Sequence, residues 1–203
     1  MIKKIKENKY KIISLVLIFI SFIFCLMAIY NKEKPKQIEE QKVNDYIEIT
    51  SIEDKEKSIE KNNNTQIKSE YFLILEIPKI NLKKGVYNFD NENNSVEKGI
   101  QLIEKSDMPN VKNGNLILAS HRGNSDVSYF NDLHKLNKAD MVYVYFNGYK
   151  YSYKIKNWYK EKKTGHLTIK RDENKNVIAL ITCVKNEDNQ VIYIGELVDQ
   201  ERY

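Results

Sequence analysis

MVYVYFNGYKYSYKI, residues 141–155, is the stretch that predicts the fold class, because two alternating segments flank Asn147 and Gly148. Alternation with a period of two is typical of β-strands, whose successive side chains point to opposite faces. An Asn-Gly dipeptide tolerates the positive φ angles of a two-residue hairpin turn. The stretch therefore predicts two antiparallel strands, 141–146 and 149–155, joined by a tight turn.

Short β-rich runs flank this hairpin on both sides from about residue 70 onward. Each has the length of a strand and is rich in Val, Ile, Leu or Tyr, with turn residues between the runs. Five runs are clear and a sixth, HLTIK, is a further candidate: 71–77, 99–103, 115–119, 177–183, 191–198 and 166–170. SYFNDLHKL, residues 128–136, has the apolar spacing of a short helix. Many short strands at close spacing predict an all-β domain, either a closed barrel or a sandwich.

The N-terminal end combines a basic segment, residues 1–11, with the uncharged run IISLVLIFISFIFCLMAIY, residues 12–30. Nineteen residues at ~1.5 Å each nearly match a ~30 Å hydrocarbon core, so the run predicts a transmembrane anchor. A cleavable signal peptide is the alternative, but its apolar region would be about 7–15 residues long and end in a small-x-small site. Lysines concentrated before the run favour a cytoplasmic N-terminus, with the rest of the chain outside the cell membrane.

Residues 31–69 are dense in charged and amide side chains, with scattered isoleucines and no sustained period. This composition predicts an extended, largely disordered stalk, with a partly helical stretch as the alternative. The β-rich domain then occupies residues 70–203. The formal net charge of the chain is +5, but there is no arginine-rich stripe or aromatic platform, which argues against a nucleic-acid partner.

Cys183 is a candidate nucleophile because it ends the apolar run VIALITC and precedes the polar loop VKNEDNQ. A small buried hydrophobe is the alternative role for such a cysteine. The other cysteine, Cys25, lies within the membrane run and is poorly placed to pair with a thiol outside. Attack by a thiol requires the thiolate and a proton donor for the leaving group, and a histidine nearby in space supplies the donor.

His121 is the best placed of the three histidines, since NLILASHRGN carries an apolar strand into a loop and puts the imidazole at the strand end. His134 is interpreted as a surface residue of the short helix, and His166 as a loop or surface residue. Side chains at the rims of two strands can converge at one mouth of a barrel. A zinc site is disfavoured because CxxC, HxxxH and HxH spacings do not occur. The GxSxG elbow of serine hydrolases is also missing from the sequence.

Together these motifs resemble the sortases, the membrane-anchored cysteine transpeptidases of Gram-positive bacteria. The resemblance covers about residues 70–203 and rests on five motifs in the order and spacing of the family: IPKINLKKGVYN, NLILASHRG, KKTGHLTI, ALITC and VIYIGELV. It implies a closed eight-stranded sortase-type β-barrel with short helices, preceded here by one N-terminal transmembrane helix. It also implies that the active cysteine and histidine lie at neighbouring strand ends.

The resemblance further implies an activity and its partners. Cys183 would attack an LPxTG-like sorting signal of a surface protein between Thr and Gly and form a thioester, and His121 would protonate the departing amine. An amine on a cell-wall peptide or a pilin lysine would then release the product. No cofactor is required for this chemistry. Thr182 matches the threonine that the family has before its cysteine, and it is either structural or a substrate contact.

The chain departs from the family where sortases carry an arginine near the start of the strand after the cysteine. Alignment on VIYIGELV puts Gln190 at that place. Glutamine can donate two amide hydrogens, but a charge-assisted hydrogen bond is roughly twice as strong as a neutral one. Three interpretations stay open: Gln190 substitutes for the arginine, Arg122 folds into the site and contacts the substrate, or the protein is catalytically impaired and serves as an anchored binding domain.

Subclass and metal binding are less sharply predicted. The sequence shows neither a pilin-type lid segment nor a long inserted helix before the cysteine strand, which favours class A or class D similarity. Glu104 and Asp107 are acidic loop residues that would be candidate calcium ligands, as in some relatives, with simple solvation as the alternative. A hydrolytic thiol protease on the same scaffold is the remaining enzymatic alternative to a transpeptidase.

Overall fold

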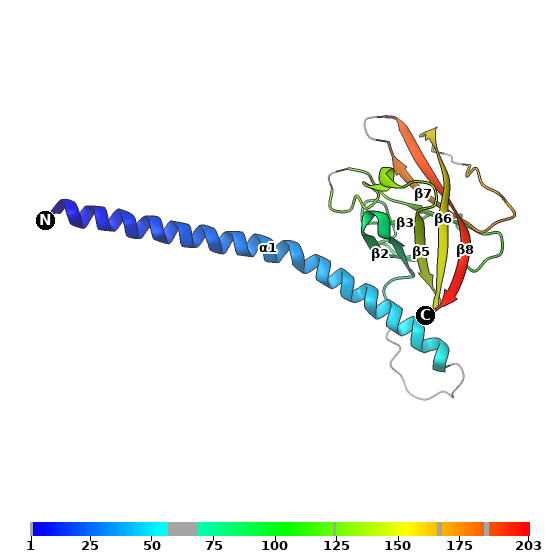
Figure 1. Cartoon of the computed structure of the whole chain (residues 1–203), viewed down its shortest axis with the longest axis horizontal. Helices are drawn as coiled ribbons and strands as arrows, with labels where there is room; N and C mark the ends of the chain where they lie inside the picture. Colours follow the sequence, from blue (N-terminus) through cyan, green and yellow to red (C-terminus); the bar gives the residue numbers. More distant parts are fainter. Residues whose placement is uncertain (1, 57–68, 124, 166–167, 185–186) are drawn as a thin grey trace. The chain divides into compact units, whose positions relative to one another are not determined.

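A computed structural model describes residues 2–56, 69–123, 125–165, 168–184 and 187–203, with side chains left undescribed at 2–12, 32 and 52–56. The chain divides into two compact units, Met1–Gln41 and Lys42–Tyr203. Helix α1, Ile2–Glu56, contributes to both of them (Figure 1). From Ile13 onward α1 is long and apolar enough to cross a membrane, and its large apolar side chains up to Tyr30 are exposed.

The conformation of residues 31–69, predicted as an extended stalk, is helical over its first part. Residues 31–56 continue α1 as regular helix, which agrees with the partly helical alternative rather than with an extended chain, while residues 57–68 lie outside the described part. The physical reason is a short apolar stripe that the charged composition obscures. Val43, Tyr46, Ile47 and Thr50 follow the spacing of one helix face, and burial of that face stabilises the helix.

This face belongs to a segment of α1, Lys42–Ser51, that we call the docking segment because it packs on the β domain within one compact unit. Val43 and Tyr46 are buried in a cluster with Tyr71 and Ile74. The Tyr46 hydroxyl donates to the backbone carbonyl oxygens of Phe72, at 3.0 Å, and Tyr145, at 3.4 Å.

Polar contacts at both ends of the docking segment add to the apolar packing. Lys42 Nζ lies 2.6 Å from a carboxylate oxygen of Glu70, and the hydroxyls of Thr50 and Tyr203 are 2.7 Å apart. The second contact ties the helix to the last residue of the chain. The β domain therefore includes a helical element that precedes residue 70.

Replacing Tyr46 with alanine is expected to lower the free energy of unfolding by about 3 kcal/mol, because a buried ring and its hydrogen bonds are lost. Thermal or denaturant unfolding of the full chain in detergent micelles measures the change. Tyr46→Phe keeps the ring and should cost only about 1 kcal/mol, and Glu48→Ala, at an exposed position of the same segment, is the control. Unchanged stability of Tyr46→Ala would show that the docking segment does not pack on the barrel in solution.

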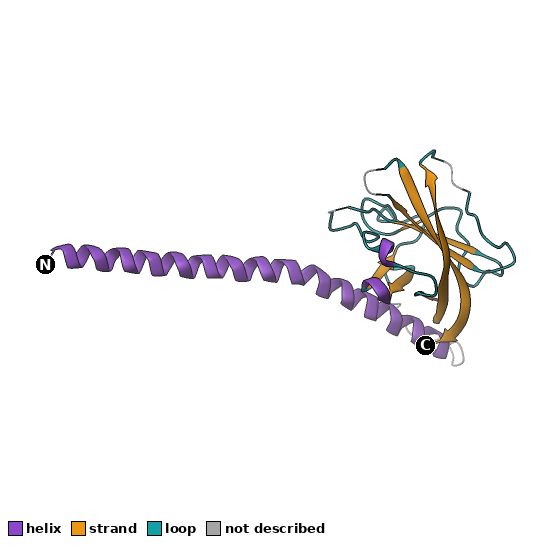
Figure 2. Cartoon of the chain, turned by 45° about the horizontal axis from the view of Figure 1, so that its top comes forward, coloured by secondary structure: helices purple, strands orange, loops and turns teal. Residues whose placement is uncertain are grey.

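The β domain is one nearly closed sheet of eight strands with two short 3-10 helices, which confirms the predicted fold class (Figure 2). Its order is β2-β1-β5-β6-β8-β7-β4-β3, and the pairing is antiparallel except between β4 and β7. The elements are β1 Leu73–Ile77, η1 Pro78–Ile80, β2 Leu82–Val86, β3 Gln101–Leu102, β4 Asn115–Ala119, η2 Leu133–Lys135, β5 Met141–Phe146, β6 Tyr149–Lys162, β7 Val177–Cys183 and β8 Asn189–Arg202.

Seven of the eight predicted strands are confirmed among the described residues, including the β5–β6 hairpin. Its turn has Asn147 at φ 49° and Gly148 at φ 75°, as an Asn-Gly turn requires. The strand predicted at 166–170 is wrong for the described residues 168–170, which are irregular. The eighth strand is β2 instead, which was not predicted because lysines interrupt its apolar pattern. Among the described residues β2 pairs with β1 alone, so its polar side chains can face solvent.

The helix predicted over 128–136 shrinks to η2, Leu133–Lys135. Its apolar positions nevertheless lie where the pattern puts them, since Phe130, Leu133 and Leu136 are all buried in the barrel core. The turns around η2 are enough to bury these side chains. A full helix is therefore not needed to cover this part of the barrel.

Apolar side chains lie on both faces of β7, and this positions the site. Ile178 and Leu180 join the barrel interior, whereas Ala179 and Ile181 belong to a second cluster on the opposite face. We call this second surface the outer face. Its other members come from β3–β4, β6, β8 and the β6–β7 loop: Ile103, Ile117, Tyr159, Ile169, Ile192 and Ile194.

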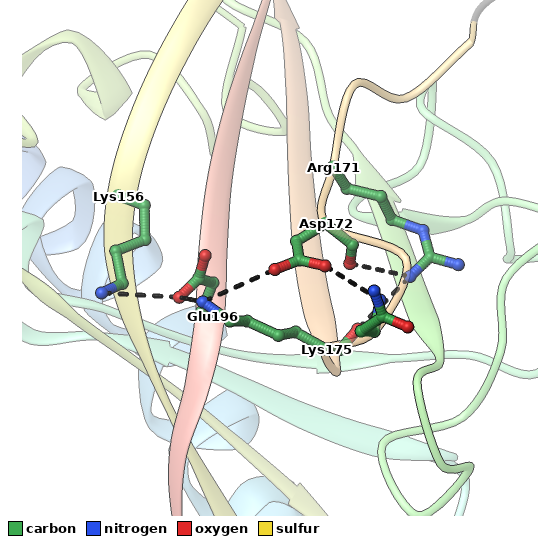
Figure 3. Close-up of polar contacts among 6 residues, drawn as sticks. Lys156, Arg171, Asp172, Lys175 and Glu196 are labelled. Carbon is green, nitrogen blue, oxygen red and sulfur yellow. Dashed lines mark hydrogen bonds and ion pairs between the residues drawn. The ribbon is translucent and has the colours of Figure 1, made fainter.

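The β6–β7 loop is fastened at its far end by a cluster of charges (Figure 3). Arg171 donates to the carbonyl oxygens of Asn113, at 3.0 Å, and Lys175, at 3.3 Å. Glu196 on β8 accepts from Lys175 at 2.9 Å and pairs with Lys156 at 3.4 Å. These contacts hold the loop at the end of β7 that lies away from Cys183, while Ile169 packs over the outer face.

Candidate active site

The parallel pairing of β4 with β7 brings Cys183 and His121 to the same edge of the sheet. Its register runs from Asn115 opposite Val177 to Ala119 opposite Ile181. Ser120 continues it, because its N–H donates to the carbonyl oxygen of Ile181 at 3.2 Å. Every such pair is offset by the same number of residues, and His121 and Cys183 have this offset too. Cys183 ends β7 and His121 follows two residues after the end of β4, so both lie at the same edge of the sheet.

Cys183 is the last residue of β7, a free thiol and half-buried. By the alternation of the strand it shares the outer face with Ala179 and Ile181. Strand β7 thus fixes the position of the sulfur, and the incomplete burial of Cys183 leaves the residue partly accessible.

Gln190 is the direct antiparallel partner of Cys183 on β8. Side chains of directly opposed residues point to the same face, with Cβ atoms about 5 Å apart. On its other side Gln190 is opposite Glu161 of β6, whose carboxylate lies 2.7 Å from Lys170 Nζ. The Gln190 side chain makes no hydrogen bond within the described residues, and its role as a donor stays a prediction.

Thr182 lies on the face of β7 opposite to Cys183 and is buried. Its hydroxyl donates to the carbonyl oxygen of Ser120 at 2.9 Å, and the Ser120 hydroxyl in turn donates to the carbonyl oxygen of Gly99 at 3.0 Å. These two bonds link β7, the end of β4 and the chain before β3. The hydroxyl of Thr182 is thereby engaged in holding the β4–β7 register, while its role as a substrate contact stays a prediction.

The proposed substrate contact of Arg122 stays a prediction. Burial raises the pKa of the Tyr193 phenol, and the charge of Arg122 opposes that rise. Tyr193 belongs to the interior cluster rather than the outer face. Arg171 is fastened at the far end of β7, and Arg202 is the last residue of β8.

Comparison with known proteins decides the family. The model of the sortase domain matches residues 75–198, which is more than half of the chain. The chain belongs to the sortase family. Sortase A of Bacillus anthracis is 30% identical over 126 residues, covering 61% of this chain and 58% of that relative. The chain of this sortase therefore spans less than two thirds of the length of that relative.

Solved structures of sortases share the fold. A sortase D5 transpeptidase of Clostridium perfringens superposes with a TM-score of 0.60 at 19% identity, covering 80% of this chain and 99% of that one. Sortase A of Listeria monocytogenes gives 0.56 at 20% identity, covering 66% and 91%. The predicted resemblance to sortases is therefore confirmed, while the class A or class D assignment stays a prediction.

One charged residue close to His121 in this sortase was not predicted from the sequence. Glu97, in the β2–β3 loop, has its carboxylate oxygen Oε1 3.9 Å from Nε2 of His121. No motif or periodicity signals this proximity, because the two residues meet only through the folding of that loop. Of the other histidines, His134 contacts the carbonyl oxygen of Asn131 within its own turn, and His166 lies outside the described residues.

The candidate calcium ligands do not form a cluster in the part of the chain that the structure describes. Asp107 accepts the backbone N–H of Asn115 at 3.0 Å, and Glu104 is exposed. No three His, Cys, Asp or Glu side chains gather there in a metal-binding arrangement. Calcium dependence stays a prediction that addition and chelation of the ion can test.

Proposed function

We propose that this sortase is a membrane-anchored cysteine transpeptidase that cleaves an LPxTG-like sorting signal and transfers it to an amine acceptor of the cell wall. The observation that carries the proposal is the parallel β4–β7 pairing, which brings Cys183 at the end of β7 and His121 just after β4 to one sheet edge. Gln190 directly opposite the cysteine completes the arrangement. The proposal assigns the role of nucleophile to Cys183, of proton donor to His121 and of oxyanion donor to Gln190.

In the first half-reaction the Cys183 thiolate attacks the carbonyl carbon of the signal's threonine. The oxyanion that develops accepts a hydrogen bond from the side-chain amide of Gln190, which stabilises the transition state. The C–N bond to glycine then breaks, and protonated His121 gives its proton to the departing amine. The products are a thioester on Cys183 and a free amino terminus.

In the second half-reaction an acceptor amine attacks the thioester carbonyl. His121, now neutral, takes the proton that the attacking nitrogen loses, and the C–S bond breaks to return the thiolate. A cell-wall peptide and a pilin lysine are both suitable acceptors, since each offers a primary amine. Water in place of the amine would give hydrolysis, so the difference between transpeptidase and thiol protease lies in the acceptor.

The outer face supplies a surface for an extended peptide. Ile181 precedes Cys183 on the same face of β7, and Ile169 of the β6–β7 loop packs against the same cluster. An apolar residue of the sorting signal can bury part of its surface there. The apolar part of α1 would anchor the enzyme, with the lysine-rich N-terminus in the cytoplasm and the β domain outside.

Intact-mass spectrometry of the full chain in detergent micelles tests the proposal. The chain is incubated with a panel of LPxTG-like peptides, with and without triglycine. The expected result is an adduct with the mass of the acyl fragment, discharged as a triglycine conjugate. Discharge by water alone, unaffected by triglycine, would instead show a hydrolytic thiol protease.

Failure of every peptide to form an adduct, with a folded chain and a reduced thiol, would contradict the proposal. It would favour an anchored binding domain, the alternative that the missing arginine supports. In that case the outer face would still bind peptide, and fluorescence anisotropy of the labelled peptides would detect it.

A further inference from the structure

Glu97 is the charged side chain that the structure places against the imidazole of the proposed proton donor. Its Oε1 lies 3.9 Å from Nε2 of His121, and both side chains are accessible, with 72% and 44% of their surface exposed. An exposed ion pair is by itself weak. Its effect therefore depends on how firmly the surrounding chain holds the two groups together.

The loop that carries Glu97 is fastened at both ends by contacts that do not involve the ion pair. On one side the Asn94 side chain donates to the carbonyl oxygen of Leu102, at 3.0 Å, and accepts its N–H, at 2.7 Å. On the other side the Gly99 carbonyl oxygen accepts the hydroxyl of Ser120, the residue before His121. These contacts thus hold the backbone of Glu97 near His121 independently of the ion pair.

The carboxylate of Glu97 is also oriented locally. Its pKa lies below the ordinary value, chiefly because its own backbone N–H and then the Ser95 hydroxyl donate hydrogen bonds to it, with a smaller contribution from His121. The backbone carbonyl oxygen of Ser95 accepts the N–H groups of Lys98, at 3.2 Å, and Gly99, at 3.0 Å. The lowered pKa of Glu97 favours its ionised carboxylate.

We propose that Glu97 is a positioning residue, which orients His121 and favours its protonated form as the donor to the leaving amine. The inference rests on the proposed function, because it takes His121 as that donor. A carboxylate within about 4 Å favours the charged form of an imidazole. Among the described residues, the Cys183 thiol on β7 lies at the same sheet edge, and the charge of Arg122 acts on Tyr193.

A first experiment observes the imidazole directly and needs no catalysis. The full chain with isotope-labelled histidine is studied by NMR in detergent micelles at neutral pH, with the His121 signal assigned by His121→Asn. In Glu97→Gln the signal should move toward that of neutral imidazole, with the protonated-to-neutral ratio falling about twofold to threefold. Glu97→Asp should restore part of the ratio, and 0.5 M NaCl should reduce the difference between wild type and Glu97→Gln.

A second experiment measures kcat/KM for acyl-enzyme formation as a function of pH. The ratio of Glu97→Gln to wild type should be near one at low pH, where His121 is protonated in both. It should fall about twofold to threefold as pH rises, with the change in kcat rather than KM. Glu92→Gln, an exposed carboxylate of the same loop, is the matched control and should behave as wild type.

The outcomes separate this inference from the proposed function. An unchanged His121 signal in Glu97→Gln would overturn the inference, whether or not the enzyme is active. A wild type that forms no adduct would overturn the proposed function, while the NMR experiment would still decide whether Glu97 acts on the imidazole. A rate loss that is equal at all pH values would indicate a structural role and also overturn the inference.

Discussion

Replacing Cys183 with alanine is expected to abolish acyl transfer, lowering the rate of peptide cleavage by roughly 10⁴-fold or more. The physical reason is that the proposed chemistry forms its covalent bond on this sulfur, and the neighbouring Thr182 hydroxyl on β7 lies on the opposite face and donates to Ser120. The variant should fold normally, because Cys183 is half-buried at a strand end and its thiol has no hydrogen bond within the described residues. Intact-mass spectrometry with the reactive peptide measures the result.

Cys25 offers a matched control within the same chain. It is the other free cysteine and lies in the apolar part of α1, so Cys25→Ala should form the adduct as the wild type does. An adduct that persists in Cys183→Ala and disappears in Cys25→Ala would contradict the assignment. Alkylation of Cys183 by iodoacetamide before the peptide is added should block the adduct as the alanine does.

Replacing Gln190 with alanine is expected to slow acyl-enzyme formation about 10²-fold, the usual cost of removing one oxyanion donor. Gln190 lies opposite Cys183 on the outer face, and its amide is not engaged by a neighbour among the described residues. Binding of the peptide should change little, because the amide acts on charge that develops only in the transition state. Single-turnover kinetics by quenched mass spectrometry separate the rate from the binding.

Two further variants sharpen this test. Asn189→Ala removes an amide one residue away whose side chain points to the opposite face and donates to Glu187 at 2.9 Å, so its rate should stay close to wild type. Gln190→Arg restores the family residue and should equal or exceed wild type, unless the guanidinium pairs with Glu161, the partner of position 190 on β6. Wild-type turnover in Gln190→Ala would show that the amide does not stabilise the oxyanion.

Local sequence patterns predicted much of this fold because they depend on neighbouring residues. Alternation and the Asn-Gly turn located β5 and β6, and apolar runs located β1, β3, β4, β7 and β8. The same reasoning failed at β2, where lysines interrupt the run of an edge strand. It also missed the docking segment, where three apolar side chains among many charges are enough once a partner surface is present.

By itself the sequence determined that this protein has an apolar helix able to span a membrane, a β-rich domain, and a cysteine and a histidine at strand ends. Only the tertiary structure decided how they combine. The parallel β4–β7 pairing brings His121 and Cys183 to one sheet edge, the β7–β8 pairing sets Gln190 opposite the cysteine, and the fastened β2–β3 loop brings Glu97 to the imidazole. Each of these depends on hydrogen bonds or packing between segments distant along the chain, and no local periodicity carries that information.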